Sequence, residues 1–401
     1  MKKGLLYLGL WVLIGCSAEK QPTTQASAKA EKIFHVGDIW VDHHYKGAGL
    51  NELVQLDDSS YQALILPEAS PINNSPWFGF KLWSEAKRNI QLDIKYEKDY
   101  KHRYVPKIST DGRSWQAIPA SHYKIDSVLG KVSLRLEVGP KKLWISAQEN
   151  IHSGHIQAWM DSLITLEGLT KETIGKSVLG QPIDLLKIKR GNPSYSLVLI
   201  GRQHPPEVPG GTLSLMAFVH SLLDESALAQ QFIDHFEIII APLLNPDGVD
   251  KGYWRFNANH KDLNRDWVEF SQPETQAVRN WIKQYPLSNP QQKYCFAIDF
   301  HTSYSGPYLL VIDTSAQAPP QPITSKWIQR IESTSQDSLD IRPRPQSLPY
   351  CYNWFINEIG IEAVTYEEGD EIDRAIIKRR AEDYARALME VLIEELTNLR
   401  Q

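Results

Sequence analysis

The sequence predicts an all-β sandwich followed by an α/β domain, in which helices cover both faces of a mixed, mostly parallel sheet. A chain of 401 residues is longer than one hydrophobic core usually accommodates, which favours two domains. Over residues 33–150, short alternating runs are separated by turn-rich stretches, which is typical of a β-sandwich. Over residues 151–401, apolar strands alternate with helical stretches, which favours parallel strands joined by helices.

The elements of both domains are predicted from their periodicity. In the first domain, the runs 77–83 and 90–94 alternate between apolar and polar residues, as half-buried strands do. In the second domain, apolar runs predict strands at 196–200, 237–244, 294–300, 309–312 and 363–366. Helical patterns predict helices at 211–223, 273–284 and 375–399.

The N-terminus predicts export from the cytosol. Lys2 and Lys3 precede an apolar run that is too short to span a bilayer as a permanent helix. The run ends in Leu-Ile-Gly-Cys16, which resembles the lipobox of bacterial lipoproteins, in which the cysteine is lipidated after cleavage. The alternative is an ordinary buried cysteine in an apolar segment. We therefore expect a signal peptide at 1–15, a lipidated tether at 16–32 and a membrane-anchored lipoprotein of the cell envelope, facing the periplasm or the surface.

Composition excludes some classes of partner and of fold. The formal charge of -5 and the pI of about 6.2 argue against a nucleic-acid-binding surface, which usually carries a basic excess. Beyond Cys16, only Cys295 and Cys351 remain, too few for a disulfide scaffold. These two cysteines either pair in an oxidising envelope or stay free, and the apolar surroundings of Cys295 favour a free, buried thiol at least as much.

Two histidines and a glutamate have the residue types and positions of a zinc site. His204 and Glu207 lie directly after one predicted strand, and His301 lies at the end of another. Imidazole and carboxylate groups are zinc ligands, and ligand sites in α/β sheets lie beyond the carboxyl ends of strands. Each signal is weak alone, because His-x-x-Glu arises by chance and strand-end histidines have many structural uses. Asp299 is expected on the opposite face of its strand, either as a partner of the site or as a surface charge.

Arginines and a further glutamate add the polar groups that peptide hydrolysis needs. Asn245-Pro246-Asp247-Gly248 is expected to be a turn. Arg255 and Arg265 follow it, and a guanidinium can bind a carboxylate through two parallel hydrogen bonds, as recognition of a peptide C-terminus requires. Glu367 is expected to emerge at the carboxyl end of the last strand as a candidate general base, and an exposed acidic loop is the alternative.

Together these clusters resemble the M14 metallocarboxypeptidase family, with His-x-x-Glu, Asn-Pro-Asp-Gly, Arg, Asn-Arg, His and Thr-x-Glu in that order. The resemblance covers about residues 166–399. It implies one Zn²⁺ per chain, held by His204, Glu207 and His301, and it implies that Glu367 is the catalytic acid/base. The preceding β domain looks like the accessory domain of cytosolic-carboxypeptidase-like members.

The same resemblance assigns the remaining polar residues to the substrate. It implies that Arg255 polarises the scissile carbonyl and that Asn264 and Arg265 hold the terminal carboxylate. Many M14 enzymes also have a mobile tyrosine before the catalytic glutamate. Here Tyr350 and Tyr352 lie slightly closer to the glutamate than that pattern requires, and Tyr350 is the candidate for this substrate-binding role.

The resulting hypothesis is a zinc-dependent metallocarboxypeptidase that hydrolyses C-terminal residues of peptides by metal-activated water. Its expected partners are a peptide with a free C-terminus and, through the lipid, a membrane, but no nucleic acid. The alternatives are a zinc deacylase of N-acyl amino acids, related to succinylglutamate desuccinylase and aspartoacylase, and a non-catalytic binding lipoprotein of the envelope. Whichever of Arg342, Arg344 and Gln346 faces the pocket is expected to set the preference, and an arginine would favour acidic C-terminal residues.

Overall fold

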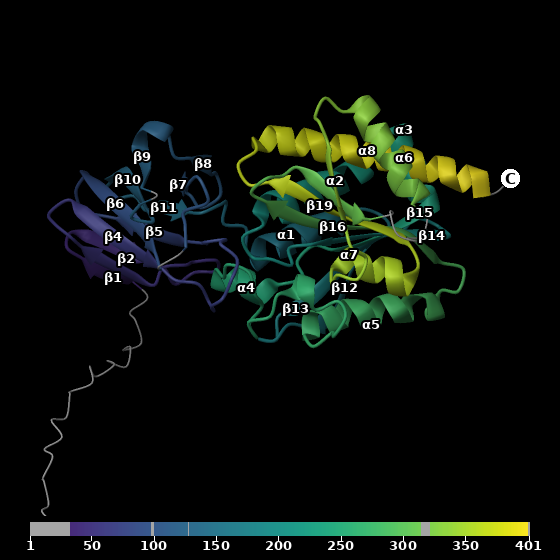
Figure 1. The fold of residues 1–401 in the computed structure, drawn as a ribbon, viewed down its shortest axis with the longest axis horizontal. Helices are drawn as coiled ribbons and strands as arrows, with labels where there is room; N and C mark the ends of the chain where they lie inside the picture. The colour runs from purple at the N-terminus through teal and green to yellow at the C-terminus, as the bar shows by residue number, and fades with distance from the viewer. Residues whose placement is uncertain (1–32, 98–99, 127, 314–320, 400–401) are drawn as a thin grey trace, which may run out of the picture.

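The computed structural model describes residues 33–97, 100–126, 128–313 and 321–399, and Figure 1 shows two adjoining domains. We call residues 33–146 the β domain and residues 153–399 the α/β domain. The predicted signal peptide, the tether and Cys16 lie outside the described residues.

Two sheets make up the β domain. The strand order of the first is β1 (Ile33–Val36), β2 (Ile39–Asp42), β5 (Gly79–Trp83), β11 (Leu143–Ser146), β7 (Lys107–Ser109) and β8 (Gln116–Ala117). The order of the second is β3 (Glu52–Gln55), β4 (Ser60–Ile65), β6 (Arg88–Tyr96), β10 (Lys131–Val138) and β9 (Tyr123–Asp126), with a short 3-10 helix, η1 (Ala120–His122), before β9. All neighbouring strands are antiparallel except β4 and β6.

Apolar side chains of the two sheets meet in one core. In β10, every second residue is buried, beginning with Val132 and Leu134. These side chains belong to the same apolar cluster as Phe80 and Leu82 of β5, in the other sheet. This strand-rich region agrees with the β domain that the sequence predicts.

One eight-stranded sheet forms the centre of the α/β domain. Its order is β12 (Leu169–Lys176), β13 (Pro182–Ile188), β15 (Phe236–Ala241), β14 (Tyr195–Gly201), β16 (Lys293–Ser303), β19 (Glu362–Gly369), β17 (Tyr308–Ile312) and β18 (Asp340–Arg344). Strands β15, β14, β16 and β19 run parallel, so their carboxyl ends meet at one edge of the sheet. Antiparallel pairs flank this centre on both sides, which makes the sheet mixed.

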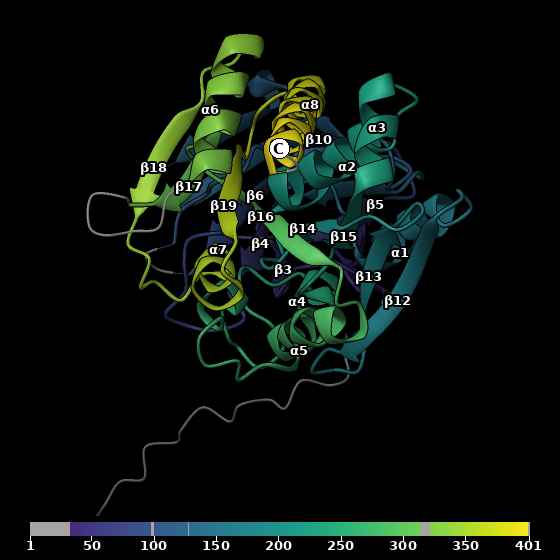
Figure 2. The ribbon, with the colours of Figure 1, turned by 90° about the vertical axis from the view of Figure 1, so that its right-hand side faces the viewer.

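Helices cover both faces of this sheet, as Figure 2 shows. One face packs against α2 (Leu215–Leu222), α3 (Ala227–His235), α6 (Pro322–Thr334) and α8 (Arg374–Leu399); the other packs against α5 (Pro273–Ser288), α7 (Cys351–Trp354) and the π-helix η4 (Phe355–Ile359). The remaining helices are α1 (Ser153–Leu163), the π-helix η2 (Pro209–Ser214), α4 (Pro246–Lys251) and the 3-10 helix η3 (Leu263–Arg265). Alternate residues of β14 enter the two cores, with Leu197 on the α8 side and Val198 on the α5 side. The predicted fold class is confirmed.

Several bounds differ from the prediction for local reasons. Strand β15 ends at Ala241, before the predicted residue 244, because Pro242 has no N–H to donate to a neighbouring strand. Strands β16 and β19 continue to Ser303 and Gly369, which places the predicted site residues inside strands rather than after them. Strands β12, β13 and β18 were not predicted; β12 and β18 lie at the sheet edges and are only partly buried, whereas β13 is mostly buried beside β15. Within the described residues, no helix combines the length and the hydropathy needed to cross a membrane.

Candidate zinc site and substrate cleft

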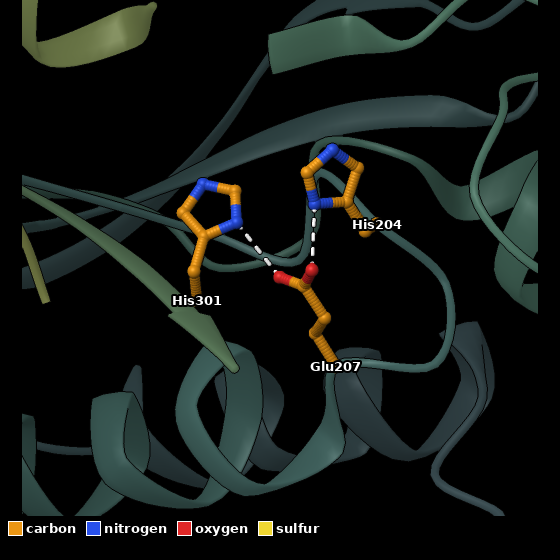
Figure 3. Close-up of side chains that lie close together, drawn as sticks. All are labelled: His204, Glu207 and His301. Carbon is orange, nitrogen blue, oxygen red and sulfur yellow. Dashed lines mark hydrogen bonds and ion pairs between the residues drawn. The ribbon is translucent and has the colours of Figure 1, made fainter. Parts of the chain in front are cut away.

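Two imidazoles and one carboxylate converge at the carboxyl edge of the central strands. His204 and Glu207 lie in the turn after β14, and His301 lies near the end of the neighbouring strand β16. Figure 3 shows the Glu207 carboxylate between the two rings, 2.7 Å from the Nδ1 atom of each. One ligand atom from each residue lies within 4.8 Å of the others, a spacing that suits a single metal ion.

A second carboxylate holds each histidine from behind. The Nε2 atom of His204 lies 2.8 Å from Asp262, and the Nε2 atom of His301 lies 2.8 Å from Asp299. A neutral imidazole that donates its Nε2 proton to a carboxylate leaves the lone pair of Nδ1 pointing at the centre of the site, and zinc ligands commonly have such partners. The residues therefore fit a zinc ion in both donor type and orientation.

The charges of the site also favour a cation. Burial alone would raise the pKa of Glu207, but the two imidazoles hold it well below its ordinary value. Burial alone would lower the pKa of His301, but Asp299 and Glu207 raise it well above its ordinary value. Protonated imidazoles thus balance the buried carboxylates in the absence of a metal, and a divalent ion at the centre would supply that positive charge once the imidazoles are deprotonated to bind it.

The prediction that Asp299 points to the opposite face of β16 from His301 is wrong. Side chains alternate along a strand with a period of two, so residues two apart share one face. Asp299 is buried with 2% exposure and lies directly behind His301. The Gln203 side chain donates to both Asp299 carboxylate oxygens at 2.8 Å and accepts from the Trp267 indole, so the support of the metal site continues into the core.

The turn that carries Glu207 packs very closely on β16. A Cβ atom on Gly210, in the π-helix η2, would lie 1.6 Å from the carbonyl oxygen of His301. Only glycine permits this approach, and the N–H of Gly210 donates to the Thr302 hydroxyl at 2.7 Å. The N–H of Thr302, the residue after His301, donates to Glu207 at 3.2 Å, so the strand that carries one candidate ligand also holds another.

Glu367 faces the same cleft from the adjacent strand. It pairs with His301 in the parallel register of β16 and β19, and its Oε2 atom is buried without a hydrogen-bond partner in the structure. Burial raises the pKa of Glu367 to about 7, against the opposing effect of His301. Such a carboxyl is suited to exchanging protons near neutral pH.

The predicted substrate residues line the same cleft. Arg255, Asn264, Arg265 and Tyr350 are all among its walls. The guanidinium of Arg265 lies 4.4 Å from the centre of the Tyr350 ring, whereas Tyr352 is fully buried and does not reach the cleft. The cleft volume is about 320 Å³, enough for the end of a peptide.

The structure distinguishes the three candidates for the side-chain pocket. Arg344 lines the cleft and forms no ion pair within the described part of the chain. Arg342 instead covers the ring of Tyr308 at 3.7 Å and donates to Asp340. Gln346 donates to Asn357 and is not among the residues that line the cleft.

Two further expectations concern local structure. Asn245-Pro246-Asp247-Gly248 is not an isolated turn but the start of helix α4, because Asn245 caps the helix by accepting from Gly248 at 2.9 Å. Cys295 and Cys351 are both free thiols, so the open question of their pairing is answered.

Several residues of the site were not predicted from the sequence. The Asp262 carboxylate lies 2.8 Å from the Nε2 atom of His204 and accepts from the Nε atom of Arg255 at 2.8 Å. Only its position two residues before Asn264 could have pointed to it in the sequence. Ser75 and Arg103 line the cleft from the β domain. Nothing in local sequence could have found them, because they lie more than a hundred residues from the ligands that they approach.

Comparison with known proteins agrees with this geometry. Residues 156–352 match the family model described as Peptidase_M14, zinc carboxypeptidase. Cytosolic carboxypeptidase 6 of Mus musculus is 24% identical over 295 residues, which is 66% of this chain and 53% of that protein. Cytosolic carboxypeptidase 2 of Homo sapiens is 33% identical over 142 residues, 32% of this chain and 15% of that protein. This chain therefore spans about half of the mouse relative and much less of the human one.

Solved structures share the fold over both domains. A metallo-carboxypeptidase from Burkholderia cenocepacia superposes with a TM-score of 0.72 at 18% identity, covering 90% of this chain and 99% of that chain. A metallo-carboxypeptidase from Pseudomonas aeruginosa, in complex with (2-guanidinoethylmercapto)succinic acid, gives 0.73 at 19% identity, covering 88% and 99%. By its α/β domain, the chain is thus similar to the Peptidase M14 zinc carboxypeptidase family, and cytosolic carboxypeptidases are among its relatives.

Proposed function

We propose that this chain is a zinc-dependent metallocarboxypeptidase, which hydrolyses the C-terminal residue of peptides. One observation carries the proposal: ligand atoms of His204, Glu207 and His301 lie within 4.8 Å of one another, in a cleft that also contains Arg255 and Glu367. The match of residues 156–352 to the M14 family model supports the same activity.

His204, Glu207 and His301 would hold one Zn²⁺, with Asp262 and Asp299 fixing the two imidazoles. Bound zinc would act as a Lewis acid that activates a water molecule at neutral pH. Glu367 would take a proton from that water and deliver it to the leaving amine, since its carboxyl faces the cleft and has a pKa near neutrality.

Arginines would bind the substrate on either side of the scissile bond. Arg255, oriented by its 2.8 Å hydrogen bond to Asp262, would stabilise the negative oxygen that develops on the scissile carbonyl. Arg265 and Asn264 would hold the terminal carboxylate, and Tyr350 would close over it from beside Arg265.

We propose further that the enzyme resembles the cytosolic-carboxypeptidase subgroup and prefers acidic C-terminal residues. Arg344 lines the cleft without an acidic partner in the described residues, so its charge is available to a substrate carboxylate. Arg103 adds positive charge on the β-domain side of the cleft, although Asp370 neutralises part of it.

Digestion of a peptide library tests the activity and the preference together. The released residue is identified by mass spectrometry, and we expect single C-terminal Asp or Glu residues, with about one zinc per chain by metal analysis. N-acyl amino acids in the same assay test the alternative of a deacylase. If the zinc-loaded protein turns over neither peptides nor N-acyl amino acids, both proposed activities are wrong. Chelation should abolish activity, and added Zn²⁺ should restore it.

The cellular location is a separate proposal, which rests on the sequence around Cys16. We propose that the chain is a lipoprotein of the cell envelope, anchored through that cysteine. Intact mass of the protein from its membrane fraction should show a diacylated N-terminal Cys16. A chain that still begins at Met1 and partitions with the soluble fraction would contradict this location.

A further inference from the structure

A carboxylate of the β domain binds the backbone beside Arg255. The Glu68 carboxylate accepts hydrogen bonds from three consecutive N–H groups, those of Trp254 at 2.8 Å, Arg255 at 2.9 Å and Phe256 at 2.8 Å. These residues belong to no helix or strand, so no regular backbone pairing fixes them. Figure 1 shows α4, the helix that directly precedes this loop, at the boundary between the domains.

The same loop is anchored in the core of the β domain. Trp254 has 1% exposure and belongs to the apolar cluster of the β domain, although it comes from the α/β domain in sequence. Its ring lies edge-on to Tyr100, with 5.1 Å between the centroids, and to Tyr96 at 6.3 Å. Burial of a whole indole removes a large apolar area from water, so the anchor is strong.

The segment after Glu367 is attached to the β domain in a similar way. Arg103 binds Asp370 through two nitrogens, at 2.7 and 3.1 Å. Lys107 binds Glu371 at 2.7 Å. The β domain therefore contacts the chain beside Arg255 and shortly after Glu367, two of the residues that we expect to act on the substrate.

We propose that Glu68 is a positioning residue for catalysis, which acts by fixing the backbone of Arg255 so that its guanidinium reaches the scissile carbonyl. This inference rests on the proposed function, since it assigns Glu68 a role only through Arg255. It gives the β domain a part in the reaction, as a rigid support for one wall of the active-site cleft.

The chemistry of the contact explains why a carboxylate is needed. Three convergent N–H donors require an acceptor with two oxygens and negative charge, which only Asp or Glu supplies. The amide of Gln has the same size but turns an NH₂ group toward at least one of these donors. Glu68→Gln therefore removes the negative charge and at least one of the three hydrogen bonds, while leaving the volume of the side chain nearly unchanged.

A double-mutant cycle between Glu68 and Arg255 tests the inference. We expect Glu68→Gln to lower kcat about 100-fold, because a small displacement of a catalytic group has effects of this size. In an Arg255→Ala background, the same change should alter kcat by less than about threefold, because the residue through which Glu68 acts is gone. Zinc content should stay at one per chain in every variant.

Two other variants exclude a purely structural explanation. Asp93→Asn removes a carboxylate that is 3% exposed within the β domain and binds Lys131, Ser133 and Gln91 of that domain, so it should leave kcat unchanged. Glu68→Asp keeps the charge on a shorter side chain and should lose less kcat than Glu68→Gln. It also keeps the inference testable if the Gln variant fails to fold.

Hydrogen exchange measures the contact between Glu68 and the three backbone amides without requiring activity. The amides of Trp254, Arg255 and Phe256 should exchange at least about 10-fold faster in Glu68→Gln than in the wild type, and Asp93→Asn should not change them. Unchanged exchange, or equal kcat losses from Glu68→Gln in both backgrounds, would overturn the positioning role. An Arg255→Ala enzyme with full kcat would instead refute the role of Arg255 in the proposed function, and the role of Glu68 with it.

Discussion

His301 and Arg255 line one cleft, yet a sheet holds the first and a neighbouring domain holds the second. His301 lies in β16, between parallel partners, and Asp299 two residues earlier on the same strand fixes its ring. Arg255 lies in a loop without regular structure, whose backbone binds Glu68 and whose neighbour Trp254 enters the β-domain core. The position of a proposed metal ligand can thus depend on local architecture, whereas that of a proposed substrate-binding group in the same cleft depends on contacts distant in sequence.

The largest effect is expected for the residue held by the sheet beside His301. Glu367→Gln should lower kcat about 1,000-fold, because general acid–base catalysis contributes on that scale, while zinc content stays at one per chain. Steady-state kinetics and metal analysis measure both quantities. Glu332→Gln, an exposed position on α6, is the matched control and should retain full activity. Full activity of Glu367→Gln would remove this residue from the mechanism.

The ion pair of Arg103 and Asp370 at the junction between the domains is expected to contribute mainly to stability. Asp370→Asn leaves the Arg103 guanidinium buried without a charged partner, since the exposed fractions of the two side chains are 4% and 15%. We expect a loss of about 3 kcal/mol in the free energy of unfolding, measured by urea denaturation. Asp161→Asn breaks the more exposed pair with Lys171 and should cost no more than about 0.5 kcal/mol. Equal losses from both variants would show that the junction is not a special source of stability.

The two carboxylates behind the histidines separate the two modes of support. Asp299→Asn and Asp262→Asn should each weaken zinc binding about 10- to 100-fold in competition with a chelator, as loss of such partners does. With zinc in saturating excess, only Asp262→Asn should still have a lowered kcat, because Asp262 also orients Arg255. Identical kinetics of the two zinc-saturated variants would contradict the link between Asp262 and substrate binding.

The smallest effect concerns substrate preference. Arg344→Gln should lower the preference for a C-terminal Glu over a C-terminal Leu about 10-fold in kcat/KM, since one charge-assisted hydrogen bond is worth roughly 1.5 kcal/mol or more. Arg342→Gln is the matched control, because its guanidinium covers Tyr308 outside the expected contact with substrate. A change in preference that follows Arg342 instead would mean that the substrate side chain lies further along the sheet.

The sequence predicted the parts of the site that local chemistry determines. His204, Glu207 and His301 each follow an apolar run, which made them candidates, and the resemblance to the M14 motifs joined them into one expected site; the structure brings their ligand atoms within 4.8 Å of one another. Asp299 is the exception. Residues two apart on a strand share one face, so the spacing from His301 predicts the contact that the structure shows, and not the opposite face.

The contacts between the domains could not be predicted. Glu68 lies more than 180 residues before Arg255, and a glutamate in a turn-rich stretch has no property that marks it as a partner for backbone amides. Trp254 belongs to the α/β domain in sequence, whereas its side chain packs in the core of the β domain. Such pairings depend on how two folded bodies dock, which periodicity within either body does not encode.

The indole of Trp254 also limits how this chain can be divided. If residues 33–146 were removed, a large aromatic ring and three backbone amides would face water with no substitute for Glu68. A shortened enzyme that consists of the α/β domain alone should therefore aggregate or lose the shape of its active site. Exchange of the β domain between relatives should succeed only where the hybrid chain retains the counterparts of both Glu68 and Trp254.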